Sequence, residues 1–309
     1  MNRVAAIDLG TNTIRILVVK PNQAGYDTLY SDQRITRLGE NLENSGFLDQ
    51  KAMERTTKAI VEMLENTKKF APTRLRIAAT SAGRTAQNTA ELAVMIQQAT
   101  GYCLEVIPWI DEARLSMLGV QSHLDKAIGD FILFDIGGGS TEYISSTNGT
   151  VASSAGTNLG VVRLTEKYIT KHPVDNDEYK AMQQEVETTV EQAFNKLGEK
   201  SYKSIRSLVG TAGTVTSLAA IDLGLVEYSA QLVNNHVLTS EIIDRMKNKL
   251  FAMELHERGK IPCLEGGRED LIVAGFAIIE STMKLAGLDR IYVSDYGLRE
   301  GLIIDMLYK

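Results

Sequence analysis

Short apolar runs alternate along the chain with longer segments in which apolar residues recur every three or four positions. The short runs predict β-strands and the periodic segments predict helices. In the first part of the chain we expect strands over 4–9, 14–20, 75–79 and 104–107. Helices are expected behind Asp49, over 91–99 and over 111–120. Asp49 is a suitable N-cap because Met53, Ile60 and Leu64 follow it at helical spacing.

The same order of elements starts again near residue 130. Strands are expected over 131–135, from 143 onward, over 208–210 and over 290–294. Helices are expected over 161–171, 177–197, 214–223, 240–255, 271–285 and 298–307. Strands interleaved with helices of this length indicate an α/β fold. Because the composition does not change along the chain, this restart alone marks the domain boundary, which we place between residues 124 and 125.

A short motif repeats at this restart. Asp8-Leu9-Gly10-Thr11-Asn12-Thr13 aligns with Asp135-Ile136-Gly137-Gly138-Gly139-Ser140, and the offset is 127 residues. Each copy ends a strand with an aspartate and continues into a turn whose N–H and hydroxyl groups suit an anion. Two such turns across an interdomain cleft would hold a phosphate and its divalent cation. The alternative is a pair of ordinary β-hairpins whose aspartates cap the turns.

A third glycine-rich turn, Gly210-Thr211-Ala212-Gly213-Thr214, lies between an expected strand and an expected helix. N–H groups at a helix start suit a phosphate or the edge of a nucleotide. Glycines at strand–helix junctions also serve close packing, so both interpretations stay open for this turn.

Composition narrows the class of protein. The 309 residues suggest two domains, and 33 basic against 39 acidic residues give a net charge of −6, which disfavours non-specific nucleic-acid binding. The two cysteines, Cys103 and Cys263, exclude a disulfide scaffold and are expected to be buried thiols. The four histidines lack zinc-like spacing. No segment approaches the roughly 18 apolar residues of a membrane span. We therefore expect a cytoplasmic enzyme or binding protein.

The three turns resemble the phosphate and adenosine motifs of the actin-like ATPase superfamily. Nearly the whole chain resembles the Ppx/GppA phosphatases, and the pair DIGGGSTE and GTAGTVTSLAA is especially specific. Further matching segments are AAIDLGTNTIRILV, ITRLGENL, ATSAGRTAQN, DEARLSMLGV, NLGVVRLTE, GGREDLIVAGFAII and YGLREGLI. This resemblance implies an α/β fold of two ribonuclease-H-like domains around an interdomain cleft. It also implies that 298–309 joins the domain of 1–124, leaving 125–297 as the second domain.

The resemblance implies a role for individual residues. Glu112 matches the glutamate taken as the base that activates water, and Arg84 matches a position that holds the phosphate chain. Asp8, Asp135 and Glu142 match the acidic positions that hold Mg²⁺, a hard cation that prefers oxygen ligands. The phosphate-binding turn residues are then Thr11, Asn12, Thr13, Gly138, Gly139, Ser140, Thr141, Gly210, Thr211 and Gly213.

Purely structural roles are also compatible with these charged residues. Glu112 would also favour the dipole of the helix that it begins, and Arg84 would also serve as a surface charge. Four more residues lie in matching segments and fit ion pairing or packing as well as ligand binding: Arg15, Arg163, Arg268 and His236.

Three segments depart from the family pattern. Pro108-Trp109-Ile110-Asp111 stands where many members have Ser-Gly-Glu-Glu, Asn41 replaces a glycine, and Ala82-Gly83 replaces Ala-Leu before Arg84. None of these changes removes an expected metal ligand or base, but they put substrate preference in doubt.

The resemblance predicts a Mg²⁺-dependent exopolyphosphatase that releases terminal orthophosphate from polyphosphate, with pppGpp hydrolysis to ppGpp as the alternative. An actin-like ATP-binding protein or kinase, or a sensor that binds polyphosphate or alarmone without turnover, is a further alternative. A homodimer is expected because relatives commonly pair.

Overall fold

A computed structural model describes residues 3–23, 25–203 and 205–308. The chain divides into two compact units. Unit 1 comprises residues 1–119 and 298–309, and unit 2 comprises residues 120–297. The division falls inside helix α5 (Trp109–Gln121), and helix α14 (Leu298–Tyr308) is part of unit 1.

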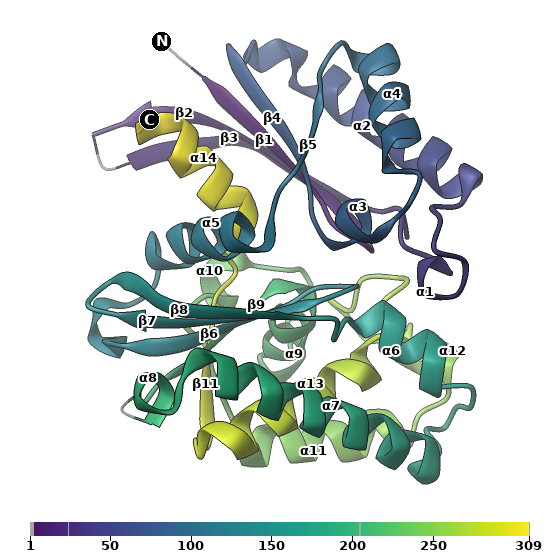
Figure 1. Cartoon of the computed structure of the whole chain (residues 1–309), viewed down its shortest axis with the longest axis vertical. Coiled ribbons are helices and arrows are strands. Elements are labelled where there is room, and N and C mark those ends of the chain that lie inside the picture. The colour runs from purple at the N-terminus through teal and green to yellow at the C-terminus, as the bar shows by residue number, and fades with distance from the viewer. Residues whose placement is uncertain (1–2, 24, 204, 309) are drawn as a thin grey trace. The chain divides into compact units, whose positions relative to one another are not determined.

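Unit 1 is built on a five-stranded sheet of order β3-β2-β1-β4-β5 (Figure 1). The strands are β1 (Val4–Leu9), β2 (Thr13–Asn22), β3 (Gly25–Ile35), β4 (Arg74–Ala79) and β5 (Leu104–Val106). β1, β2 and β3 are antiparallel neighbours, whereas β4 and β5 run parallel to β1. Besides α5 and α14, the helices are α1 (Leu42–Ser45), α2 (Gln50–Thr67), α3 (Ser81–Thr85) and α4 (Thr89–Thr100).

The two faces of this sheet have separate cores. Ile7 and Leu9 of β1 pack in one cluster with apolar residues of α2 and α4. Val4 and Ala6 pack in the other cluster with apolar residues of α5 and α14. Because side chains alternate along a strand, Asp8 lies on the same face of the sheet as α5 and α14.

Helix α2 begins as the sequence predicts. The Asp49 carboxylate accepts hydrogen bonds from the backbone N–H groups of Lys51 (2.9 Å) and Ala52 (3.2 Å). Met53 and Ile60 are buried against the sheet. The N-cap prediction is therefore confirmed.

Unit 2 contains a six-stranded sheet of order β10-β11-β9-β6-β7-β8. The strands are β6 (Phe131–Ile136), β7 (Thr141–Thr147), β8 (Thr150–Thr157), β9 (Leu208–Thr211), β10 (Val237–Thr239) and β11 (Arg290–Val293). Counted from β8 to β11, the order and directions repeat those of unit 1, with β10 added at one edge. The α/β prediction is thus confirmed, and the predicted repeat of the strand–turn–strand module is present in the fold.

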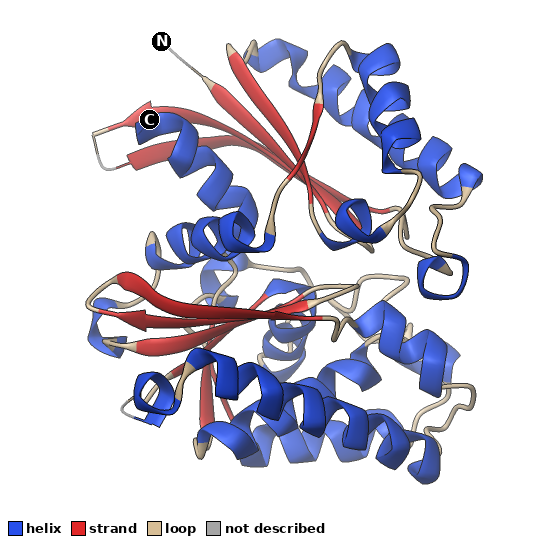
Figure 2. Cartoon of the chain, viewed as in Figure 1, coloured by secondary structure: helices blue, strands red, loops and turns tan. Residues whose placement is uncertain are grey.

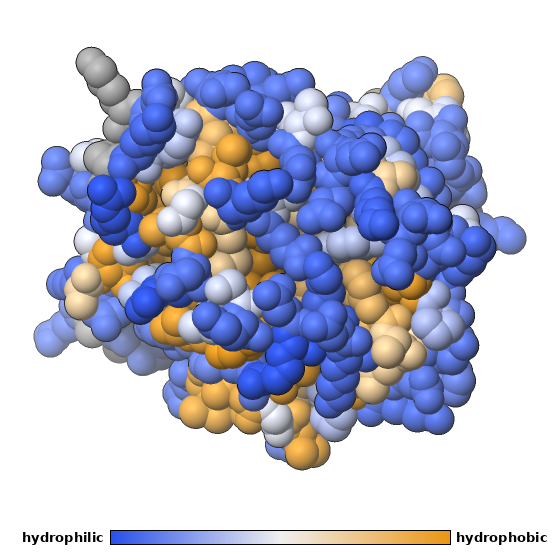
Figure 3. Space-filling model, turned by 90° about the horizontal axis from the view of Figure 1, so that it is seen from below, coloured by the Kyte–Doolittle hydropathy of each residue, from blue (hydrophilic) through white to orange (hydrophobic). Residues whose placement is uncertain are grey.

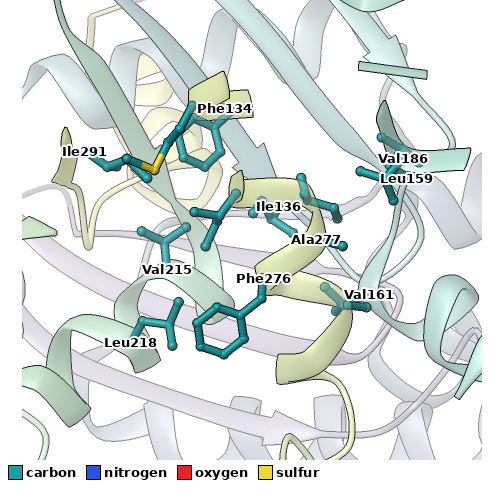
Figure 4. Close-up of a cluster of buried hydrophobic side chains, with 14 of the residues drawn as sticks. Phe134, Ile136, Leu159, Val161, Val186, Val215, Leu218, Phe276, Ala277 and Ile291 are labelled. Carbon is teal, nitrogen blue, oxygen red and sulfur yellow. The ribbon is translucent and has the colours of Figure 1, made fainter. Parts of the chain in front are cut away.

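The helices of unit 2 pack largely on one face of its sheet. They are α6 (Val161–Tyr168), α7 (Asn176–Leu197), α8 (Glu199–Lys203), α9 (Ala212–Asp222), α10 (Ala230–Val233), α11 (Ser240–Phe251), α12 (Leu255–Arg258) and α13 (Ile272–Ala286). Figure 4 shows Phe134 and Ile136 of β6 beside Val215 of α9 and Phe276 of α13. Asp135 lies between these two core residues in sequence, so its side chain is on the opposite face of the sheet.

The strands that the sequence did not predict are all edge strands. β3, β8 and β10 each pair with a single neighbour. β3 is rich in polar residues, and β8 consists almost entirely of small and polar residues, so neither presents a strong apolar pattern. Figure 2 shows that each unit combines β-strands with helices.

The prediction of two buried thiols is wrong. Cys103 is exposed and Cys263 is half-buried. Cys103 directly precedes the edge strand β5, where the chain runs along the surface, and a small apolar side chain needs no burial there.

Hydrophilic residues dominate the face drawn in Figure 3, and hydrophobic residues reach the surface there in separate patches. Within the described residues, no helix combines the length and apolar character needed to cross a membrane.

Candidate functional site

The two repeated turns have the same backbone geometry. The N–H of Gly10 donates to the carbonyl of Thr13 over 3.1 Å, and the N–H of Gly137 donates to the carbonyl of Ser140 over 2.8 Å. Each turn joins two antiparallel strands, β1 to β2 in unit 1 and β6 to β7 in unit 2. The sequence repeat is therefore also a repeat of local structure.

A neighbouring segment holds the unit 1 turn from outside. The N–H groups of Thr36 and Arg37 donate to the Asn12 carbonyl (3.0 and 2.9 Å), and the N–H of Gly39 donates to the Thr11 carbonyl (2.8 Å). This segment is part of the ITRLGENL match.

Two side-chain oxygens of the unit 1 turn are buried. Thr11 and Asn12 are only 6% and 8% exposed. Among the residues that the structure describes, neither Oγ1 of Thr11 nor Oδ1 of Asn12 has a hydrogen-bond partner. Buried polar atoms are usually hydrogen-bonded, and oxygens without a partner also occur among the described residues at Thr56 and Ser281. The pair at Thr11 and Asn12 is therefore compatible with a polar ligand at the turn and does not require one.

Asp135 and Glu142 are paired across the first two strands of unit 2. They are directly opposite in the antiparallel register of β6 and β7. Residues opposite each other in such a pair have Cβ atoms about 4.5–5.5 Å apart and share a face of the sheet. The Ser140 hydroxyl donates to Oε1 of the buried Glu142 over 2.8 Å. The equivalent register pair in unit 1 is Asp8 and Arg15, so only unit 2 has two carboxylates at this position.

The expected magnesium ligands are therefore divided between the units, with Asp8 in unit 1 and the other two in unit 2. In the described part of the chain, no three metal-ligating side chains gather. Mg²⁺ is nevertheless commonly held by one or two carboxylates together with water and substrate phosphate. Two neighbouring carboxylates also repel each other unless a cation lies near them. The Asp135–Glu142 pair thus fits Mg²⁺, and the role of Asp8 as a further ligand stays a prediction.

Helix α6 fixes the unit 2 turn. The N–H groups of Val161 and Val162 donate to the carbonyls of Gly137 (3.1 Å) and Gly138 (2.9 Å). A Cβ at Gly160 would come within 2.2 Å of the carbonyl carbon of Gly139, so only glycine lets the backbones approach this closely. The Thr141 hydroxyl is buried and donates to the Leu159 carbonyl (2.6 Å). That hydroxyl therefore holds the turn in place, and a phosphate contact would fall to other groups of the turn.

Glu112 and Arg84 form a buried ion pair in unit 1. Glu112 lies in the first turn of α5, and Arg84 lies in α3, which follows β4. Their side chains are only 8% and 12% exposed. Arg84 Nη1 contacts the Glu112 carboxylate and donates to the Ile107 carbonyl over 3.0 Å. Arg84 is thus not a surface charge, and it compensates the carboxylate charge of the expected base.

The third glycine-rich turn makes its hydrogen bonds with other residues of unit 2. Gly210 is buried in β9, and its carbonyl accepts from the N–H of Ser294 (2.8 Å). The Thr211 hydroxyl lies 3.0 Å from the carbonyls of Ser294 and Tyr296. These contacts favour the packing interpretation for Gly210 and for the hydroxyl of Thr211.

Gly213 lies against an arginine. A Cβ there would come within 1.6 Å of Nη1 of Arg268, which also pairs with Glu265 over 3.0 Å. The start of helix α9 therefore has a guanidinium beside it, and a phosphate-binding role for Gly213 stays a prediction.

The remaining charged candidates make contacts within their units. Arg163 Nη1 donates to the Asn158 carbonyl over 3.0 Å, and His236 Nε2 lies 2.9 Å from Asp222. These contacts are consistent with structural roles for both residues.

Two residues of the site were not identified from sequence as functional. Trp109 stacks on Arg84, with the guanidinium carbon 4.0 Å from the ring centroid. Gly160 permits the close approach of α6 to the unit 2 turn. Trp109 stood out only as a departure from the family pattern, and Gly160 was visible only as part of NLGVVRLTE.

The sequence of this chain is similar to that of known proteins over nearly its whole length. The sequence profile described as the Ppx/GppA phosphatase family matches residues 17–309. A curated relative from Mycobacterium tuberculosis, named Exopolyphosphatase 2, is 29% identical, and the alignment covers 99% of both chains.

Two solved structures share the fold over nearly the full length. A Ppx/GppA family member from Aquifex aeolicus has a TM-score of 0.81 and 29% identity, covering 99% of this chain and 97% of that one. An exopolyphosphatase from Cytophaga hutchinsonii has a TM-score of 0.89 and 25% identity, covering 99% of this chain and 98% of that one.

Proposed function

Because the chain belongs to the Ppx/GppA phosphatase family, we propose that it is an exopolyphosphatase that releases terminal orthophosphate from inorganic polyphosphate. Its reaction class, phosphoanhydride hydrolysis, follows from the family and from the curated relatives. We propose polyphosphate rather than pppGpp as the substrate because the relative named Exopolyphosphatase 2 aligns over 99% of both chains. That alignment is the observation that carries the choice of substrate.

Glu112 is the proposed general base. It takes a proton from a water molecule whose oxygen attacks the terminal phosphorus atom. The bond from this phosphorus to the bridging oxygen breaks, and its electron pair stays on the shortened polyphosphate chain. The contact between Glu112 and Arg84 supports this assignment. It puts the Arg84 guanidinium beside the proposed base, and this cation would bind the negative charge on a phosphoryl group.

The repeated turns are the proposed phosphate-binding elements. Oγ1 of Thr11 and Oδ1 of Asn12 have no partner among the described residues, which supports a polar ligand at this turn. In unit 2, the glycines at 138 and 139 have no side chain that would shield their N–H groups from an anion.

Asp135 and Glu142 are the residues that would hold Mg²⁺, and the hydroxyl of Ser140 orients Glu142. When bound, Mg²⁺ supplies charge neutralisation and polarisation of phosphoryl oxygens. The protein itself fixes the two carboxylates on one face of the sheet.

The test is phosphate release from polyphosphate of several defined lengths and from pppGpp, measured side by side with Mg²⁺. We expect polyphosphate to give the higher kcat/KM. A higher kcat/KM with pppGpp would assign the protein to the alternative substrate. Transfer of phosphate from ATP to an acceptor, without free phosphate, would overturn the hydrolase assignment.

A further inference from the structure

The chain has one tryptophan, and it lies on the arginine of the proposed site. Trp109 opens helix α5, three positions before Glu112. Its ring centroid is 4.0 Å from Cζ of Arg84, which is the stacking distance of a cation–π contact. The Arg84 guanidinium therefore has the indole on one face and the Glu112 carboxylate and Ile107 carbonyl on its edge.

This arrangement restricts Arg84 in two ways. The carboxylate fixes where the donor edge points, and the indole fixes the plane of the guanidinium. Cation–π attraction is stronger when the cation is shielded from water, and the Arg84 side chain is only 12% exposed. A long side chain such as arginine otherwise loses considerable rotamer freedom when it binds a ligand.

We propose that Trp109 is a positioning residue that holds the Arg84 guanidinium in the plane from which it meets a phosphoryl group of the substrate. This inference rests on the proposed function of Arg84 as a phosphate-binding residue. An arriving phosphoryl group competes with Glu112 for the donors of Arg84, so anion binding changes the charge next to the indole. The alternative is a packing role, in which Trp109 only covers apolar surface at the start of α5.

The first experiment uses the emission of the single tryptophan. Inorganic phosphate and tripolyphosphate are titrated separately into the full-length protein with Mg²⁺ present. We expect a saturable change in Trp109 emission in the wild type and in Arg290→Gln, whose exposed arginine pairs with Asp289. We expect none in Arg84→Gln. A wild-type emission that stays constant while either anion binds, as measured by calorimetry, would overturn the proposal.

The second experiment separates positioning from folding. We expect Trp109→Ala to lower kcat/KM about tenfold, the size of a partly desolvated cation–π contact, and Trp109→Phe to restore most of the loss because it keeps an aromatic face. Ile110→Ala is the matched control, since Ile110 is the next residue and is 64% exposed. Unchanged kinetics in Trp109→Ala, or an equal loss in Ile110→Ala, would overturn the proposal.

The two experiments distinguish the possible failures. A wild-type protein that releases no phosphate from any substrate contradicts the proposed function, and the emission titration then still decides whether Trp109 and Arg84 respond to an anion. An active wild type whose Trp109 variants have normal kinetics contradicts only the positioning role.

Discussion

Asp135 and Glu142 lie directly opposite each other in the antiparallel register of β6 and β7. The same register position in unit 1 holds an aspartate and an arginine, Asp8 and Arg15. The repeated module thus places two carboxylates together in only one of its copies. Metal dependence is therefore expected to rest on the carboxylate pair in unit 2.

Replacing Asp135 with asparagine keeps the shape of the side chain and removes its charge. We expect the Mg²⁺ concentration for half-maximal phosphate release to rise at least about a hundredfold. Ser140→Ala removes only the hydrogen bond to Glu142, and its expected effect is about tenfold, as for groups that orient a metal ligand. A Mg²⁺ titration of activity measures both effects. Identical Mg²⁺ dependence in wild type and Asp135→Asn would show that this pair does not hold the metal.

Replacing Glu112 with glutamine removes the proposed base and keeps an oxygen that accepts from Arg84. Phosphate release should fall by a factor of about 10²–10⁴, the usual contribution of a general base. Binding of polyphosphate, followed by calorimetry, should be largely retained because the turns are unchanged. Turnover at the wild-type rate would mean that another group activates water.

Gly160→Ala would force a Cβ to within 2.2 Å of the Gly139 backbone. Neither backbone can move without disturbing the turn, so we expect a loss of at least about 1–3 kcal/mol in the free energy of unfolding. Phosphate binding should weaken as well. Urea unfolding and calorimetry measure these two effects. Gly266→Ala is the matched control, since a Cβ there meets nothing within 4 Å, and an equal loss in both variants would contradict the steric explanation.

His172 gives unit 2 a pH dependence. Burial, together with the nearby positive charge of Arg258, lowers the pKa of His172 in the folded protein. Nη2 of Arg258 lies 2.5 Å from Nδ1 of the ring. In the unfolded chain His172 therefore binds a proton near pH 6.5, whereas in the folded protein it binds one only at a lower pH. The free energy of unfolding that depends on neutral His172 is complete above that pH and decreases as the pH drops below about 6.5.

Urea unfolding at pH 7.5 and pH 5.5 tests this expectation. The wild type and His256→Gln, which changes an exposed histidine, should lose the same amount of stability at the lower pH. His172→Gln should lose less, because it has no proton to take up in the unfolded state. An unchanged pH dependence in His172→Gln would contradict the assigned cause.

Local features of the chain were predictable because short-range physics sets them. The apolar runs of β1 and β6 and the Asp49 cap of α2 depend on residues a few positions apart. The turns at Gly10 and Gly137 likewise close on residues three positions away. The sequence by itself therefore determined most strands and helices, the repeated turns and the identity of the candidate acidic residues.

Contacts between distant residues were decided only by the tertiary structure. The polar edge strands β3 and β8 form because a neighbouring strand offers hydrogen-bond partners, which no apolar pattern announces. Arg84 and Glu112 are 28 positions apart, and their burial as a pair depends on how α3 and α5 pack around the sheet. The stacking of Trp109 on Arg84 depends on the same packing. Side-chain geometry of this kind follows from the assembled fold, because the free energy of each contact depends on groups that the chain brings together only when it folds.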